Sequence, residues 1–205
     1  QHKAKAGSAV MLDVRSGEVL AMVNQPAYNP NGRRDNRGGR LRNRAVTDVL
    51  EPGSTVKPFV IALAMERGLV GPATEVETAP GWIRVGRHTV KDVRNFGLMD
   101  VAGVITKSSN VGITKVALQL EPEAMWQFYR ALGMGTVTES GFPGEVAGQV
   151  PHFSGWSRFE HATLAFGYGL SVTTLQLARA YAVLAADGIK RPVSLLKLEQ
   201  SPAGE

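Results

Sequence analysis

Cysteine is absent from this chain of 205 residues. Its absence excludes disulfide bonds, thiolate catalysis and cysteine-based metal sites. Histidine is also scarce, and His88, His152 and His161 show none of the spacings, such as His-x-x-x-His, that are typical of metal ligands. We therefore do not expect a metal enzyme.

The sequence also lacks a long hydrophobic run. The longest uncharged stretch, residues 162–178, is interrupted by glycine and threonine and falls short of the ~20 apolar residues of a membrane-spanning helix. The first residues, Gln1 to Lys5, have no apolar signal-peptide core. We expect a soluble protein, or one whose membrane anchor is absent.

The residues that are present are typical of one folded domain. Hydrophobic residues make up 43% of the chain and charged residues 20%, a balance that argues against wholesale disorder. Much of the net charge of +5 comes from one segment, in which six arginines stand among Gly, Asn and Asp: Arg33, Arg34, Arg37, Arg40, Arg42 and Arg44. No aromatic residue is interleaved there for base stacking, so we expect a solvated loop and no nucleic-acid partner.

The hydrophobic pattern predicts one hairpin followed by several helices. Residues 8–24 alternate apolar and polar around a glycine turn, which favours two paired strands. Residues 82–93 are expected to be extended, and helices are expected over 54–68, 101–107, 111–120, 122–132 and 173–186. This order predicts an α+β fold.

The most informative segment is Ser54-Thr55-Val56-Lys57, which follows a Pro-Gly turn and precedes an apolar helix. Side chains three positions apart on a helix face the same way, so the amine of Lys57 can take the proton of the Ser54 hydroxyl. Pro58 lacks the N–H that would bond to the Ser54 carbonyl, which predicts a 3₁₀-like first turn. The alternative is that Ser54 merely caps the helix.

A second polar segment, Ser108-Ser109-Asn110, lies between two predicted helices. The Ser108 hydroxyl can relay a proton between a lysine and a leaving group, and the Asn110 amide can hold a substrate carbonyl. The alternative is that these residues cap the helix that starts at Val111.

Together these segments resemble the class B penicillin-binding proteins, and most closely the division-specific, FtsI-type members of Gram-negative bacteria. The resemblance is closest in Glu51-Pro52-Gly53-Ser54-Thr55-Val56-Lys57-Pro58-Phe59 and Lys107-Ser108-Ser109-Asn110-Val111-Gly112. It extends to the hairpin at residues 9–22, to Asn43-Arg44-Ala45, to residues 141–145 and to residues 167–172, and so covers nearly the whole chain.

The resemblance implies a β-lactamase-like transpeptidase fold and a peptidoglycan D,D-transpeptidase activity in septal cell-wall synthesis. Ser54 would be the nucleophile, Lys57 its base and Ser108 a proton relay, while Asn110 and Ser109 would bind substrate. The partners implied are the D-Ala-D-Ala end of a stem peptide, β-lactam antibiotics, and division proteins such as a lipid II glycosyltransferase of the FtsW type. No cofactor is implied, and the location implied is the periplasmic face of the bacterial inner membrane.

One family element is missing, because the 205 residues contain no Lys-Ser-Gly or Lys-Thr-Gly tripeptide. We therefore expect residues 1–205 to form a partial transpeptidase domain with an incomplete central sheet. The membrane anchor, the N-terminal module and the C-terminal strands would be absent, and the piece would be weakly active or inactive on its own.

Three other functions remain open. A β-lactamase shares the nucleophile, but no Glu-x-x-Leu-Asn segment is present to activate a deacylating water. A D,D-carboxypeptidase differs only in using water as the acceptor. A non-catalytic module that senses β-lactams or binds division proteins would explain the missing tripeptide.

Overall fold

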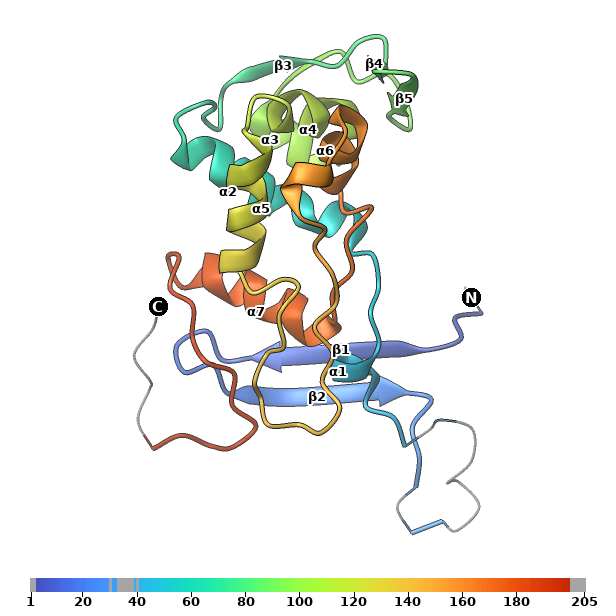
Figure 1. The fold of residues 1–205 in the computed structure, drawn as a ribbon, viewed down its shortest axis with the longest axis vertical. Coiled ribbons are helices and arrows are strands. Elements are labelled where there is room, and N and C mark those ends of the chain that lie inside the picture. The colour runs from blue at the N-terminus through green and yellow to red at the C-terminus, as the bar shows by residue number, and fades with distance from the viewer. Residues whose placement is uncertain (1–2, 30, 33–38, 40, 200–205) are drawn as a thin grey trace. The chain divides into compact units, whose positions relative to one another are not determined.

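A computed structural model describes residues 3–29, 31–32, 39 and 41–199 (Figure 1). The chain forms two compact units: residues 1–50, 132–149 and 171–205 belong to the first, and residues 51–131 and 150–170 to the second. Four of the six clustered arginines, namely Arg33, Arg34, Arg37 and Arg40, lie outside the described residues.

The first unit is built on the expected hairpin. Strands β1 (Gly7–Leu12) and β2 (Val19–Gln25) pair antiparallel, with Ala9 opposite Val23 and a register shift between Met11 and Leu12. Gly17 lies in the connecting turn with φ of +80°, a conformation that costs glycine little. The hairpin prediction is confirmed.

Two helices complete this unit, α1 (Arg44–Thr47) and α7 (Thr174–Ala185), and both pack against β1. The buried residues Val46, Leu175 and Val193 form its core, against which one face of the hairpin packs. Arg42 precedes α1, and Arg44 is its first residue. Each forms a 2.7 Å ion pair with Asp48, the residue that follows the helix. These two arginines are therefore paired with a carboxylate, although the Arg42 side chain remains 52% exposed, in keeping with the solvated loop that we expected.

The second unit is mainly helical. Its elements are the 3₁₀ helix η1 (Gly53–Val56), α2 (Lys57–Glu66), α3 (Val101–Thr106), α4 (Asn110–Ala117), α5 (Pro122–Ala131), η2 (Phe153–Gly155) and α6 (Arg158–Leu164). Two short antiparallel pairs accompany them, β3 (Glu75–Glu77) with β6 (Leu98–Asp100) and β4 (Trp82–Val85) with β5 (His88–Lys91).

Helix α2 contacts α3, α4 and α5 within the second unit. One broad face of α2 is buried, including Phe59, Val60 and Leu63, whereas Met65 and Glu66 at its end are exposed. A helix places its apolar face toward the core in this way. Lys57, the first residue of α2, is therefore also buried.

Candidate active site

Ser54 lies in the 3₁₀ helix η1, immediately before α2. The Lys57 N–H donates to the Ser54 carbonyl, three residues back, and the Thr55 hydroxyl donates to the carbonyl of Pro52 at 2.7 Å. Because Pro58 has no N–H, it cannot form the longer α-helical bond to Ser54. The predicted 3₁₀ first turn is thereby confirmed, and the Ser54 residue it presents is exposed.

Lys57 is 1% exposed, and its ammonium is surrounded by oxygen atoms. The Nζ atom donates to the Ser108 carbonyl at 2.6 Å, to the Ser108 hydroxyl at 3.0 Å and to Oδ1 of Asn110 at 2.8 Å. An ammonium has three N–H donors, so these three acceptors satisfy the group completely. The structure thus brings together three of the residues that the sequence nominates, from segments more than 50 positions apart.

Burial disfavours the charged form of an amine. Desolvation therefore lowers the pKa of Lys57 from 10.5 to about 8, while the negative charge of Asp92 opposes this shift. An amine with this pKa is partly neutral near pH 7, which is what a general base requires.

Ser108 connects α3 to α4 in a left-handed backbone conformation, with φ of +56°. Its N–H donates to the carbonyl of Ile105 at 3.0 Å, and the residue is exposed. Non-glycine residues with positive φ are uncommon, and they cluster at functional sites. This conformation lets residue 108 offer both its carbonyl and its hydroxyl to Lys57.

Asp92, which follows β5, is a residue of this site that the sequence pattern did not indicate. Its Oδ1 accepts from the backbone N–H groups of Asn110 at 2.5 Å and Val111 at 3.0 Å, and its Oδ2 accepts from the Ser109 hydroxyl at 2.6 Å. Asp92 stands about 20 residues before these partners, without a spacing rule that links them. The contact is visible only in three dimensions.

Ser109 is placed differently from Ser108 and Asn110. It is 0% exposed, and its hydroxyl accepts from the Gly112 N–H at 2.8 Å as the N-cap of α4. A contact with substrate stays a prediction for Ser109, and the position of its hydroxyl favours the capping role that was the alternative. Its hydroxyl also donates to the Asp92 carboxylate at 2.6 Å, so the Ser109 hydroxyl has two partners within the protein.

The turn that carries Ser54 is also held by the segment around Gly167. The Gly53 N–H donates to the Gly167 carbonyl at 3.2 Å, and the Gly169 N–H donates to Oε1 of Glu51 at 2.9 Å. Gly167 has φ of +84°, and a Cβ atom placed there would overlap the backbone of Gly53. The two backbones approach so closely that only glycine fits.

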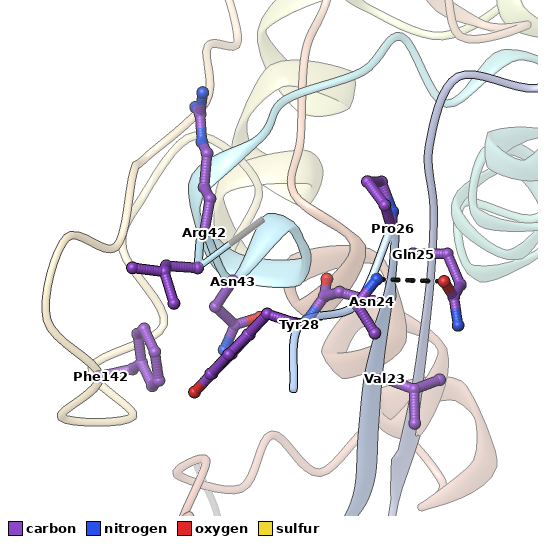
Figure 2. A pocket seen from close by; sticks show the side chains of 10 residues that line it. Val23, Asn24, Gln25, Pro26, Tyr28, Arg42, Asn43 and Phe142 are labelled. Atoms are coloured by element: carbon purple, nitrogen blue, oxygen red, sulfur yellow. Dashed lines mark hydrogen bonds between the residues drawn. The ribbon is translucent and has the colours of Figure 1, made fainter. Parts of the chain in front are cut away.

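A separate pocket of about 440 Å³ lies in the first unit, at the end of the hairpin. Figure 2 shows Val23, Tyr28, Arg42 and Phe142 around it. It is lined by described residues of the first unit, whereas Ser54, Lys57, Ser108 and Asn110 belong to the second. The pocket is therefore a different feature from the cluster around Lys57.

Among the described residues, no group of three or more His, Asp or Glu side chains is arranged to hold a metal ion. Over the same part of the chain, none of the helices combines the length and the apolar character needed to cross a bilayer.

Comparison with known proteins assigns the class. The family model described as "Penicillin binding protein transpeptidase domain" matches residues 7–203, and the chain belongs to this family. The family and the α+β fold class predicted from the motifs are thereby confirmed.

Individual relatives refine this assignment. The probable peptidoglycan D,D-transpeptidase PenA of Neisseria flavescens is 48% identical over 204 residues, which cover 100% of this chain and 50% of the relative. The peptidoglycan D,D-transpeptidase FtsI of Escherichia coli K12 is 46% identical over 204 residues, which cover 100% of this chain and 34% of the relative.

Solved structures agree with these relatives. A peptidoglycan glycosyltransferase from Burkholderia ambifaria matches with a TM-score of 0.89 and 45% identity, over 99% of this chain and 60% of that chain. The apo transpeptidase domain of penicillin-binding protein 3 from Burkholderia pseudomallei matches with a TM-score of 0.89 and 44% identity, over 98% of this chain and 57% of that chain. The chain thus spans half or less of the length of the two curated relatives.

Proposed function

We propose that this chain provides the active serine of a peptidoglycan D,D-transpeptidase, which cross-links stem peptides and is acylated by β-lactams. The observation that carries the proposal is the buried side chain of Lys57, a residue that directly follows the turn of Ser54 and whose amine contacts Ser108 and Asn110. The family match over residues 7–203 and relatives named D,D-transpeptidases support it.

The proposed reaction begins with the neutral form of Lys57. Its amine takes the proton of the Ser54 hydroxyl, and the Ser54 oxygen attacks the carbonyl carbon of the penultimate D-alanine. The peptide C–N bond then breaks, and the terminal D-alanine leaves with a proton that passes from Lys57 through the Ser108 hydroxyl. The product is an ester on Ser54 and free D-alanine.

The second half of the reaction reverses the roles. An amine of a neighbouring strand attacks the ester carbonyl, the bond to the Ser54 oxygen breaks, and Ser54 regains a proton. Asn110 would orient the substrate by its side-chain amide, whose Nδ2 donates to the Lys91 carbonyl at 3.2 Å in the free protein. β-Lactams would enter the first half and stop there, because their acyl group stays attached to Ser54.

The wider setting is part of the same proposal. A septal D,D-transpeptidase would act at the periplasmic face of the inner membrane, together with division proteins such as a lipid II glycosyltransferase of the FtsW type. The name FtsI of the E. coli relative supports a role in division.

A fluorescent penicillin tests the proposal on the protein in its natural, full-length form. We expect stoichiometric labelling that mass spectrometry locates on Ser54, loss of labelling in Ser54→Ala, and normal labelling in Ser154→Ala, an exposed serine of the same unit. Labelling at another residue, or labelling that persists in Ser54→Ala, would contradict the proposal.

Product analysis then distinguishes the acceptor. With a stem pentapeptide and an amine acceptor, we expect release of D-alanine together with an amide-linked product. Release of D-alanine with only the hydrolysed peptide would instead identify a D,D-carboxypeptidase, and rapid turnover of penicillin would identify a β-lactamase.

A further inference from the structure

The β4–β5 hairpin is held at both ends against helices of the second unit. The ring of His88, at the start of β5, stacks on the ring of Phe159 in α6, with 4.2 Å between centroids. At the other end, Asp92 follows β5 and bonds to the first turn of α4. The hairpin therefore has a fixed position, and Asp92 has a fixed position with it.

Among the described residues, the carboxylate of Asp92 has three hydrogen-bond partners, and all of them belong to the Ser-x-Asn segment or to the residue that follows it. Its carboxylate accepts from the N–H groups of Asn110 and Val111 and from the hydroxyl of Ser109. Carboxylates that accept from the amides at a helix N-terminus form charge-assisted bonds, which are stronger than neutral ones. Asp92 thus fixes the start of α4 together with the Ser109 cap.

The start of α4 also determines the surroundings of Lys57. Asn110, the first residue of α4, provides one of the three acceptors of the ammonium, and Ser108 provides the other two. On the preceding side, the segment is tied to α3 only through backbone bonds, such as that from the Ser109 N–H to the Val104 carbonyl at 2.9 Å. From outside the segment, side-chain bonds to residues 109–111 come from Lys57 and from Asp92, and of these two only Asp92 bonds to the backbone N–H groups of Asn110 and Val111.

We propose that Asp92 is a positioning residue for the acylation of Ser54, and that it acts by holding the Ser-x-Asn segment against Lys57. This inference rests on the proposed function. The hydrogen bonds of its carboxylate go to Ser109, Asn110 and Val111, so the effect of Asp92 passes through these residues.

The charge of Asp92 adds a second effect, which distinguishes positioning from simple helix capping. Its negative charge raises the pKa of Lys57 against the larger lowering by burial. The residues that bond to the Lys57 amine are uncharged: Asn110 comes from α4, and Ser108 comes from the connection between α3 and α4. Among the described residues, Asp92 is the charged group that acts on the pKa of this amine.

Two substitutions separate the two effects. Asp92→Asn keeps an oxygen that can accept from the two backbone amides but removes the charge, whereas Asp92→Ala removes both. The matched control is Asp100→Ala, because Asp100 caps the neighbouring helix α3 by accepting from the Gly103 N–H at 2.7 Å. Loss of that cap lowers stability without a contact to Lys57.

The experiment measures the second-order rate constant of acylation by a fluorescent penicillin, in the natural, full-length protein and well below its melting temperature. We expect Asp92→Ala to lose roughly tenfold to hundredfold, as small misplacements of catalytic groups do, and Asp100→Ala to keep the wild-type rate. For Asp92→Asn we expect a smaller loss and a rising limb of the pH profile that is displaced to lower pH, by about half a unit or more.

The outcomes are distinguishable from those of the proposed function. If the wild type is not labelled at Ser54, both the function and this inference fail. If the wild type is labelled and folded Asp92→Ala reacts at the same rate, this inference alone is overturned. Should Asp92→Ala not fold, the Asp92→Asn profile decides, and a rate and a midpoint that both equal those of the wild type overturn the inference.

Discussion

The Nζ atom of Lys57 lies 2.8 Å from the Oδ1 atom of Asn110, a residue 53 positions further along the chain. With the carbonyl and hydroxyl of Ser108, this oxygen occupies all three N–H donors of the ammonium. To act as a base, Lys57 must therefore lose a proton, which leaves a lone pair and two N–H donors. Its pKa decides at which pH this happens.

The pH dependence of acylation follows from the pKa of Lys57, which burial lowers to about 8. Below that value, the fraction of Lys57 that is neutral increases about tenfold per pH unit. We expect the second-order rate constant with a fluorescent penicillin to rise by the same factor. Above it the rate constant should level off. Stopped-flow fluorescence between pH 6 and pH 10 measures the profile.

Two profiles would contradict this prediction. A rate constant that is constant between pH 6 and pH 8 would mean that the base is already neutral or is a different group. A rate constant that continues to rise beyond pH 10 would mean that Lys57 titrates as an ordinary exposed lysine.

Ser108→Ala tests the relay role of the hydroxyl. The substitution removes the acceptor at 3.0 Å from Lys57 but leaves the Ser108 carbonyl and Asn110 in place. We expect acylation to slow by about a hundredfold, the usual size of a lost proton-transfer contribution. Because the lost hydroxyl leaves one N–H of the buried Lys57 ammonium without its acceptor, the free energy of unfolding should fall by about 1 to 3 kcal/mol.

The matched control is Thr106→Ala, which removes an exposed hydroxyl two residues earlier, bonded at 3.3 Å to the Gly103 carbonyl. We expect this variant to react as the wild type does. An equal loss in the two variants would assign the effect to the α3–α4 connection and not to the Ser108 hydroxyl.

The parts of the site that could be predicted from the sequence are those that depend on neighbours along the chain. The absence of an N–H in Pro58 determines that Ser54 sits in a 3₁₀ turn, and this is a local property. The helices on either side of Ser109 were likewise predicted from their periodicity. Both α3 and α4 begin and end within a few residues of the predicted bounds, 101–107 and 111–120.

Other parts were missed for two different reasons. Helix α6 was overlooked although Ser157-x-x-Glu160 forms a capping box, so a sequence signal existed. Asp92 and the pairing of β3 with β6 depend on contacts between distant residues and on strands of three residues. Segments that short have no periodicity to detect.

Gly167→Ala tests the close approach between residue 167 and the turn before Ser54. The added Cβ would overlap the backbone nitrogen and oxygen of Gly53, in a left-handed conformation. Strain of about 1 to 2 kcal/mol from the backbone adds to about 1 to 3 kcal/mol from overpacking. We expect a loss of about 3 kcal/mol in the free energy of unfolding, measured by urea denaturation, and slower acylation of the folded protein.

Gly169→Ala is the control, because Gly169 has nearly the same φ, +87°, but a Cβ there would meet only Leu164, at 3.7 Å. It should show the backbone strain alone, about 1 to 2 kcal/mol, with acylation close to that of the wild type. If the two alanines destabilised equally, the contact with Gly53 would not be the reason for glycine at position 167.

Lys57 should also affect stability in a pH-dependent manner. Its pKa is about 8 in the folded protein and 10.5 when unperturbed, so between these values the unfolded chain binds more protons than the folded one. Stability rises with pH wherever this holds. The contribution of Lys57 should therefore improve from pH 8 to pH 10.5, by up to about 3 kcal/mol at 1.36 kcal/mol per unit.

Comparison with Lys57→Met isolates this contribution, since other titrating groups cancel in the difference between the two proteins. We expect the free energy of unfolding of the wild type, relative to the variant, to increase as the pH is raised through that interval and to stay constant below pH 7. Urea denaturation followed by circular dichroism at several pH values measures it. A difference that does not change with pH would show that the pKa of Lys57 is the same in the folded and unfolded chain, and that burial does not prepare this amine to act as a base.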